Sequence, residues 1–575
     1  MYIEKIPNRN SPPAILLRES WREGKRIRKR TIANLSQLPG HVIETLQRAL
    51  KGEHLVSIHE VFRIERSFPH GHVAAVVKMI RRLGLDNLIA AKRTRQRDIV
   101  MAMIVERLIH PSSKLANTRL WKTTSLGKEL DVEDAKVDEL YDALRWLLRR
   151  QRRIENKLAA RHLSEDSPVL YDVTSSYYEG RTCPLAMFGH SRDHRKDRPQ
   201  IVYGVMTDEK GRPVAVDVYP GNTGDPSTVI DQVEKLRTRF GLGRVVLVGD
   251  RGMLTQTKID ILRQFPGIGW ISALKSGAIS SLIQSGTIQM SLFDKTNLAE
   301  ISSPEFPGER LIVCYNPFLA EERTRKREAL LDQTRKALDK IATEVKRRTK
   351  TPLMKDQIAL KVGKIINRYK MGKHFSFTIE DGQFLWRVDK NAVETEKMLD
   401  GIYVVRTSEP KKRFSAEKTV RTYKSLSLVE HAFRTLKGID IRVRPIYHRL
   451  EETVRAHIFL CLLAYYVEWH MRHYLAPLLF EDEDIESTRL VRDPVAPAES
   501  SVSAKIKKSR RRTSDGFPVH SFETLLQDLA TQSKNICLSQ LETSTTRVEL
   551  ITEPTPLQTR VFELLDVYPV NGSQE

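Results

Sequence analysis

The spacing of hydrophobic positions changes along the chain, and each change predicts a different kind of structure. From Gln96 to about His162, apolar residues recur three and four positions apart, as in DIVMAMIVERLI and DELYDALRWLLRRQRRIENKLAARHL. This spacing is typical of amphipathic helices and predicts a helical domain over residues 81–164. Before it, residues 1–80 form a small basic module, in which REGKRIRKR predicts a hairpin or arm ahead of a helix at Val42–Leu50.

Residues 165–280 change to the pattern of strands. One strand is predicted at SPVLYDVTSSYY, two more with a turn at QIVYGVMTDEKGRPVAVDVYP, and two short apolar strands at RVVLVGD and GWISALK. Helical patterns, STVIDQVEKLRTRF and TQTKIDILRQF, separate the later strands. This order predicts a mixed sheet whose parallel strands are joined by helical crossovers, and it matches the order of a ribonuclease-H-like core. The predicted fold class is therefore α/β.

The remaining segments interrupt or extend this core. Residues 281–400 carry a long charged helical pattern and strand-like runs, which predict a large inserted α+β subdomain. Residues 401–480 resume the core with the helices SLVEHAFRTLKG and AHIFLCLLAYYVEWH. Residues 481–516 are polar and aperiodic, which predicts a disordered linker, and residues 517–575 form a C-terminal module with helical periodicity at Phe522–Leu541.

The charge balance points to a polyanionic partner. Lys and Arg outnumber Asp and Glu by 95 to 72, which gives a formal net charge of +23 at pH 7. An ordinary basic enzyme remains an alternative, but basic runs spread over separate segments favour a long track of phosphate contacts on nucleic acid. In the helical domain the run RRQRR is expected to face DNA. The runs are Lys25–Arg30, Arg149–Arg153, Arg323–Arg327, Lys346–Lys350 and Lys505–Arg512.

Cysteine usage and hydropathy exclude several other classes of protein. The four cysteines lie far apart without paired spacing, which argues against a disulfide framework or a zinc site and fits a reducing cytoplasm. The first residues, MYIEKIPNRNSPPAIL, lack the pattern of a signal peptide. The most apolar helical stretch, His457–Val467, is too short to span a bilayer, so no membrane role is expected.

Two aspartates follow apolar strands of the predicted core. Asp172 lies in YDVTSS, where alternation points Tyr171 and Asp172 to opposite faces, and Asp250 lies in VVLVGDRGM beside Gly249 and Gly252. The carboxyl ends of neighbouring strands are where open α/β sheets bind ligands, so the two side chains are expected to converge. Either aspartate alone also fits a turn or helix cap.

A third acidic residue, Glu430, lies in the helical pattern YKSLSLVEHAFRTLKG, which Gly438 ends. Tyr423, Glu430 and Lys437 are spaced seven residues apart, about two helical turns, so they share one face if the helix extends back to Tyr423. A solvated face with a salt bridge gives the same pattern.

These motifs together resemble insertion-sequence transposases of the broad IS4 group, most closely the IS1634 family. The resemblance is carried by YDVTSSYYEG, by GHSRDHRKDRPQIVYGVMTDEKGRPVAVDVYPGNTGD, by VLVGDRGML and by VEHAFRTLKG with RPIYHRLEETVRAHIFLCLLAYYVEW, and it covers most of residues 1–480. It implies that Asp172, Asp250 and Glu430 are a catalytic triad that binds metal. It also implies cut-and-paste transposition of an insertion sequence.

The resemblance further implies which groups contact DNA. Tyr423, Glu430 and Lys437 fall on the family's Tyr, Arg, Glu, Lys signature, whereas Leu426 occupies the position of the signature arginine. Arg434 or Arg421 is the expected substitute. Two Mg²⁺ ions, for which Mn²⁺ can substitute, suit carboxylate ligands and in-line phosphodiester cleavage. The expected DNA contacts are Tyr423, Lys437, Arg434, Arg251 and Arg195.

The expected partners are double-stranded DNA, as terminal inverted repeats and as target, and a second copy of the chain, since two DNA ends must be paired. His190 and His194 lie four apart in GHSRDHR, where a polar loop near DNA is favoured over a metal site. Two alternative functions stay open. One is a ribonuclease-H-like nuclease without strand transfer, and the other is a transposase-derived DNA-binding protein that no longer catalyses.

Overall fold

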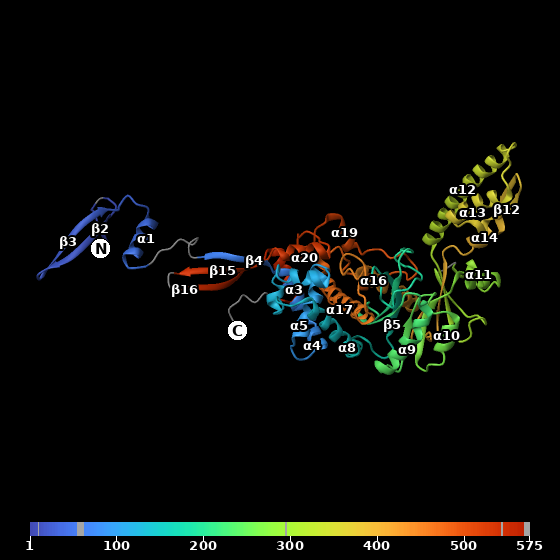
Figure 1. The fold of residues 1–575 in the computed structure, drawn as a ribbon, viewed down its shortest axis with the longest axis horizontal. Coiled ribbons are helices and arrows are strands. Elements are labelled where there is room, and N and C mark those ends of the chain that lie inside the picture. The colour runs from blue at the N-terminus through green and yellow to red at the C-terminus, as the bar shows by residue number, and fades with distance from the viewer. Residues whose placement is uncertain (10, 54–61, 294–295, 542–543, 568–575) are drawn as a thin grey trace. The chain divides into compact units, whose positions relative to one another are not determined.

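A computed structural model describes residues 1–9, 11–53, 62–293, 296–541 and 544–567, and Figure 1 shows its elements. The chain divides into two compact units. Among the described residues, the smaller unit combines residues 1–69 with 532–553, and the larger unit contains residues 70–531 and 554–567. No helix in the described ranges is both long and apolar enough to cross a membrane. The four cysteines are free and buried, as the absence of paired spacing predicts.

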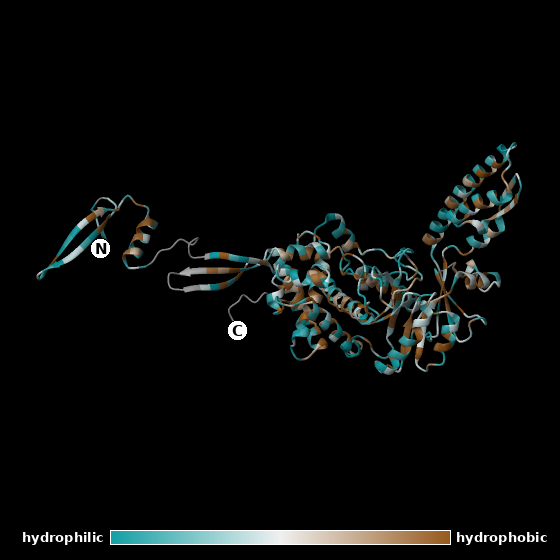
Figure 2. Cartoon of the chain, viewed as in Figure 1, coloured by the Kyte–Doolittle hydropathy of each residue, from teal (hydrophilic) through white to brown (hydrophobic). Residues whose placement is uncertain are grey.

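The smaller unit begins with the predicted basic hairpin. Strands β1 (Tyr2–Ile6), β2 (Ala14–Glu23) and β3 (Arg26–Asn34) form an antiparallel sheet, and α1 (Gly40–Leu50) follows. Gly24, with φ +62°, makes the turn between β2 and β3, since glycine adopts this conformation without steric cost. Figure 2 shows mostly hydrophilic residues toward the tip of this hairpin. The predictions of a basic hairpin and of a helix near Val42–Leu50 are confirmed.

A second sheet of the smaller unit joins distant parts of the chain. Its strand order is β16-β15-β4, with β4 at Phe62–Pro69, β15 at Ser533–Leu541 and β16 at Ser544–Ile551. The helical prediction for Phe522–Leu541 is therefore wrong in its second half, because helix α20 (Phe522–Ala530) ends before β15 begins. The partner of β15 comes from the other end of the chain, so local periodicity carries no sign of it.

The larger unit is built on an eight-stranded mixed sheet with the order β10-β11-β14-β9-β8-β5-β6-β7. Strand β5 pairs antiparallel with β6 and parallel with β8, and β8 pairs parallel with β9. Helices α9 and α10 lie in the connections to β8 and β9. The predicted mixed sheet with helical crossovers is confirmed. The bounds are β5 (Pro168–Tyr177), β6 (Gln200–Thr207), β7 (Pro213–Pro220), α9 (Val229–Glu234), β8 (Val245–Val248), α10 (Gln256–Leu262) and β9 (Ile268–Ala273).

Helices that precede the sheet in the chain and helices that follow it pack with the sheet in one hydrophobic core. Helix α17 (Glu451–Leu475) is buried along most of its length and packs against α5, α8 and β7, which explains why it is apolar on almost every face. The helical domain predicted over residues 81–164 is helical as expected. Its elements are α3 (Gly71–Arg82), α4 (Leu85–Ile89), α5 (Arg95–Ile109), α6 (Lys114–Leu120), α7 (Leu126–Glu129) and α8 (Val137–His162), and α21 (Pro556–Leu565) packs on α17.

The region 281–400 is only partly a separate body. Strands β10 (Leu298–Ile301) and β11 (Arg310–Tyr315) extend the main sheet through β14 (Ile402–Thr407). The residues that follow β11 have a hydrophobic core of their own, which includes Leu338 and Phe384. That body consists of α12 (Pro317–Arg347), α13 (Lys355–Tyr369), β12 (Phe375–Glu380), β13 (Gln383–Val388) and α14 (Lys390–Lys397), and α11 (Ser276–Gln284) precedes β10.

Residues 481–516 are ordered, so the prediction of a disordered linker is wrong. Helices α18 (Ile485–Val491) and α19 (Val502–Arg510) form here. Ser501 caps α19 and donates to Asp482 (2.6 Å), and Lys507 Nζ donates to the Ala476 carbonyl oxygen (2.8 Å). Val495 is 1% exposed. Polar side-chain contacts hold this segment, and they leave no hydrophobic period in the sequence.

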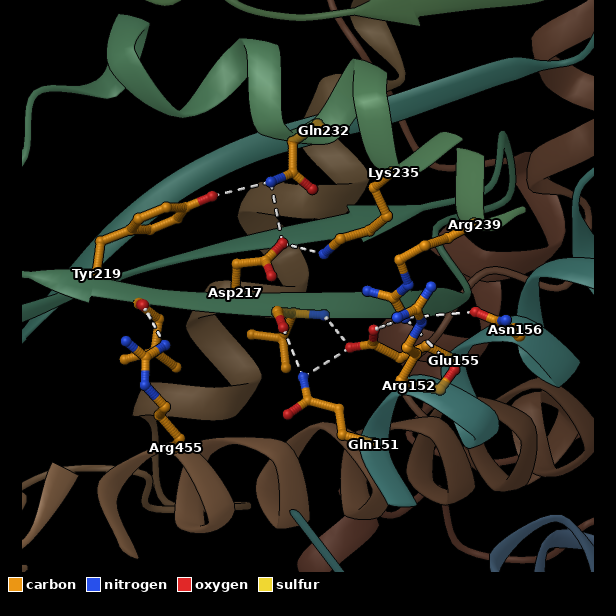
Figure 3. A network of polar contacts seen from close by, with 12 residues as sticks. Gln151, Arg152, Glu155, Asn156, Asp217, Tyr219, Gln232, Lys235, Arg239 and Arg455 are labelled. Carbon is orange, nitrogen blue, oxygen red and sulfur yellow. Dashed lines mark hydrogen bonds and ion pairs between the residues drawn. The ribbon is translucent and has the colours of Figure 1, made fainter. Parts of the chain in front are cut away.

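Strand β7 lies at one edge of the main sheet. Side chains bind the backbone N–H and C=O groups that its outer edge leaves unpaired (Figure 3). Glu155 Oε1 accepts from Val216 N (3.2 Å), and Gln151 Nε2 donates to Val216 O (2.9 Å). The guanidinium of Arg455 donates to Val218 O (2.6 Å). Covering an edge in this way prevents pairing with another strand.

We expect Glu155→Gln to destabilise the larger unit by about 2 kcal/mol, the typical value of hydrogen bonds to a charged group. The side chain of Glu155 is 1% exposed and forms an ion pair with Arg239 (2.8 Å). The neutral amide of glutamine would leave the Arg239 guanidinium without that countercharge. Chemical unfolding of the purified protein measures the difference. Exposed Glu209→Gln is the matched control, and equal stabilities of the two variants would contradict the assignment.

Candidate active site

Asp172 projects from the middle of β5, the strand that connects the antiparallel and parallel parts of the sheet. Its neighbour Tyr171 is fully buried on the opposite face, as alternation predicts. Asp172 Oδ1 accepts from Val173 N (2.7 Å). Burial and, to a smaller extent, the negative charge of Asp250 raise the pKa of Asp172 to about 7, while the hydrogen bond from Val173 and the charge of Arg192 oppose the shift. The carboxyl group thus lies where its charge is poorly compensated.

Asp250 follows β8, the parallel neighbour of β5, in a tight turn. Its Oδ1 accepts from Gly252 N (3.1 Å) and Met253 N (2.7 Å), and its carbonyl accepts from Ser272 Oγ (3.2 Å). Asp250 therefore caps this turn. Oδ2 accepts no hydrogen bond from the described residues, and a Cβ at Gly252 would lie 3.3 Å from it. Glycine at this position leaves space beside the free carboxylate oxygen.

Glu430 comes from helix α16 (Leu426–Lys437), where its side chain is exposed. The predicted continuous helix back to Tyr423 is two helices, because α15 (Ala416–Lys424) ends at Ser425 before α16 begins. Tyr423 nevertheless lies beside the site. Burial raises the pKa of Tyr423 to about 12, and the charges of Asp250, Glu430 and Asp172 each raise it too.

The three carboxylates therefore come from three elements and all act on the Tyr423 hydroxyl. They are not drawn together tightly: within the described ranges, no three His, Cys, Asp or Glu side chains lie close enough to hold a metal ion. Arg251, which follows Asp250, opposes the shift at Tyr423 and so also lies near the site. The geometry is that of an open acidic cluster beside the end of β8. Asp172 lies in the middle of β5 rather than at its end as the sequence predicts, because β5 continues beyond β8 to pair with β6.

Lys437 forms an ion pair with Asp193, a partner that the sequence does not predict. Lys437 Nζ donates to Asp193 Oδ1 (3.0 Å), and Arg444 forms an ion pair with the same oxygen. Asp193 Oδ2 accepts from Tyr177 N (3.0 Å), and its side chain is 2% exposed. Burial lowers the pKa of Lys437, whereas Asp193 opposes that shift. Asp193 thus ties the GHSRDHR loop to β5 and α16.

The arginines expected at DNA differ in their surroundings. Arg434 and Arg251 are exposed, and neither guanidinium has a hydrogen bond or ion pair within the described residues. Arg195 pairs with Asp197 (3.0 Å) and lies over the ring of Tyr177 (5.2 Å). Only the first two are thus free of protein partners.

Leu426, at the position of the signature arginine, packs against the hydrophobic core. Of its two expected substitutes, Arg421 donates to the Arg492 carbonyl oxygen (2.6 Å) and so faces α18 and the segment after it. Arg434 is unengaged on α16, the helix of Glu430. The structure therefore favours Arg434 as the arginine available to a ligand.

Two further groups near Asp172 were missed as site residues. Arg192 and Asp225 form an ion pair with each other, and both affect the pKa of Asp172. Arg192 N also donates to Ser175 Oγ (3.1 Å) of β5. The sequence feature that could have identified them is that Arg192 lies in the GHSRDHR motif and Asp225 in the GNTGD motif. His190 and His194 are exposed, and within the described ranges they belong to no metal-binding group.

Comparisons with known proteins show which family this chain belongs to. A family model described as a transposase DDE domain matches residues 164–467, which is more than half of the chain. A model of the IS1634 family transposase N-terminal domain matches residues 3–57. Comparison with curated protein sequences finds no match.

Among solved structures, the chain is similar to a piggyBac transposase in a synaptic complex with hairpin DNA, at 9% identity. The similarity covers 80% of this chain and 76% of that one, with a TM-score of 0.32. The chain belongs to the DDE transposases, which cleave DNA and transfer strands, and its N-terminal region is that of the IS1634 family.

Proposed function

We propose that this transposase binds the terminal inverted repeats of its own element and performs cut-and-paste transposition with Asp172, Asp250 and Glu430. The observation that carries this proposal is that Asp172 of β5 and Asp250, directly after β8, lie at the same level of two adjacent parallel strands, since Leu170 pairs with Val248. Glu430 comes from helix α16, far along the chain, and Tyr423, whose pKa all three carboxylates raise, lies beside them. Chance placement of three acids around one point is not expected, since like charges repel.

We further propose that the core is ribonuclease-H-like. The support is the strand order β7-β6-β5-β8-β9, with antiparallel pairs β5·β6 and β6·β7 and parallel pairs β5·β8 and β8·β9. The main sheet is larger than this five-stranded part, because β14, β11 and β10 continue it. In this proposal β10 and β11 belong to the core rather than to the inserted subdomain, and the C-terminal module is divided, because β15 and β16 form a sheet with β4.

DDE transposases generally use divalent metal ions. The residues fit such ions: the negative charge of Asp250 raises the pKa of Asp172, and Asp250 keeps one carboxylate oxygen free beside Gly252. We propose two Mg²⁺ ions, which Mn²⁺ can replace, held by Asp172, Asp250 and Glu430. Bound there, they would activate the nucleophile and stabilise charge on the attacking and leaving oxygens.

The protein's own side chains orient the DNA in this proposal. Tyr423 presents a neutral hydroxyl to a phosphate near the cut, and its raised pKa extends the range in which it keeps the proton to well above neutral pH. Lys437 is held beside α16 by Asp193, where its charge faces the same region. Arg251, Arg434 and Arg195 supply further phosphate contacts. Pairing of two ends makes a homodimer on DNA the expected assembly.

The test is incubation of the purified protein with DNA that carries the element's inverted repeats and with Mg²⁺. Cleavage at the repeat ends followed by joining to target DNA supports the proposal. Cleavage without joining would instead support a nuclease without strand transfer. Binding without cleavage in Mg²⁺ or Mn²⁺ would indicate a DNA-binding protein that no longer catalyses.

We expect Arg434→Ala to weaken binding of repeat DNA without changing the fold. Removing one phosphate contact lowers the slope of log affinity against log salt by about 0.9. Fluorescence anisotropy at several salt concentrations measures that slope. Arg421→Ala is the comparison, since the Arg421 side chain binds a backbone carbonyl, and a larger loss of slope there would contradict the choice of Arg434.

A further inference from the structure

A cavity of about 250 Å³ lies between the helical domain and the loop that precedes α17. Basic side chains dominate its lining, and none of the described residues that line it is acidic. The charged or titratable lining groups that matter here are Arg107, Lys114, Arg442, Arg444, His448 and His457. We call this cavity the cationic pocket.

Lys114 is the unusual member of the cationic pocket. It is 4% exposed, yet its ammonium group has no hydrogen bond or ion pair within the described residues. Burial and, to a smaller extent, the charge of Arg107 lower the pKa of Lys114 to about 7. A buried ammonium group without a partner is costly, and a bound anion would relieve that cost.

The neighbouring groups do not supply the missing negative charge. Arg107 is 7% exposed and donates only to backbone carbonyls, those of Ser112 (3.1 Å), Ile441 (3.3 Å) and Arg442 (3.4 Å). The adjacent acid, Glu106, has its pKa raised by burial to about 8 and is mostly uncharged at neutral pH.

The two histidines add no positive charge of their own. Burial lowers the pKa of His448 to about 3 and that of His457 well below its usual value. His457 Nε2 donates to Val443 O (3.0 Å). The positive charge of the pocket therefore comes from lysine and arginine, which are the side chains that bind phosphate.

We propose that the cationic pocket binds a backbone phosphate of the DNA that the active site cuts. The inference rests on the proposed function. Arg444 lines the pocket and also pairs with Asp193, which binds Lys437 of α16, so one chain of ion pairs connects the pocket to the helix of Glu430. Arg442 at the exposed side gives the phosphate an entrance lined with charge.

The experiment compares the full-length parent protein with Lys114→Met, which removes the charge and keeps an unbranched side chain of similar length. Affinity for repeat DNA is measured by anisotropy between 50 and 200 mM salt. We expect the salt slope to fall by about 0.9, so that the parent loses about threefold more affinity over this range than the variant. Lys122→Met, at an exposed lysine of the same domain, is the matched control and should keep the parent slope.

A parent-like slope in a folded Lys114→Met protein would overturn the proposal. A second arm uses inorganic phosphate alone. If it raised the unfolding temperature of the parent but the salt slope for DNA were unchanged, the pocket would bind free phosphate and the DNA assignment would be wrong. Binding is measured here without cleavage, so loss of activity in carboxylate variants tests the proposed function separately.

Discussion

Replacing Asp250 with asparagine should reduce the rate of end cleavage by about 10³-fold or more. Metal ions stabilise the transition state of phosphodiester cleavage by several kcal/mol, and a neutral amide in place of the carboxylate removes most of that contribution. The turn should survive, because the amide oxygen can still accept from Gly252 N and Met253 N as Asp250 Oδ1 does. Single-turnover cleavage of labelled repeat DNA measures the rate.

Asp260→Asn is the matched control. Asp260 lies in α10, on the same connection between β8 and β9, and its side chain is 53% exposed. The Asp260→Asn protein should cleave at the parent rate. An Asp250→Asn protein that folds, binds repeat DNA and cleaves as fast as the control would show that the capping role of Asp250 is its only role.

Lys114→Met should make the DNA-free protein more stable at neutral pH, by up to roughly 5 kcal/mol if the whole pKa shift is expressed. The pKa of Lys114 falls from 10.5 unfolded to about 7 folded, so the unfolded state binds more protons between these values. The stability of the parent therefore rises with pH across that window, and the full destabilisation by the buried Lys114 ammonium group is present below pH 7.

Methionine removes this dependence, so the advantage of the variant should be larger at pH 6 than at pH 9. Thermal unfolding of both proteins at the two pH values measures it. The exposed control Lys122→Met should show no such difference. A variant that is less stable than the parent at pH 6 would mean that Lys114 has a partner that compensates its charge.

Much of the fold follows from local pattern. The strands of the core and the helices α5, α8 and α17 are predictable because each repeats apolar residues at its own period. Pairing between distant segments leaves no such trace. Strand β15 pairs with β4, and β11 with β14, across long stretches of chain, and neither pairing is visible in periodicity. Residues 481–516 fold through polar contacts and capping, which the sequence shows as aperiodic.

The proposed active site also combines locally visible and long-range features. Asp172 and Asp250 stand out in the sequence because they lie on or directly after apolar strands, whereas Glu430 is proposed from the family resemblance, since its helix comes from a distant part of the chain. Asp193 and Arg192 could not be ranked from sequence. Their roles depend on which side of β5 their loop packs against, and that is decided by hydrogen bonds to Tyr177 and Ser175.

The most direct measurement maps the metal site on the protein itself. Fe²⁺ is bound in place of Mg²⁺ in the presence of repeat DNA, and hydrogen peroxide is added with ascorbate. The iron reduces the peroxide to a hydroxyl radical and hydroxide, ascorbate restores Fe²⁺, and the radicals cut the nearby polypeptide backbone. The account predicts cuts beside Asp172, Asp250 and Glu430, three places far apart in sequence, and their loss in Asp250→Asn. Cuts confined to other segments, such as the loop of His190 and His194, or unchanged in Asp250→Asn, would contradict it.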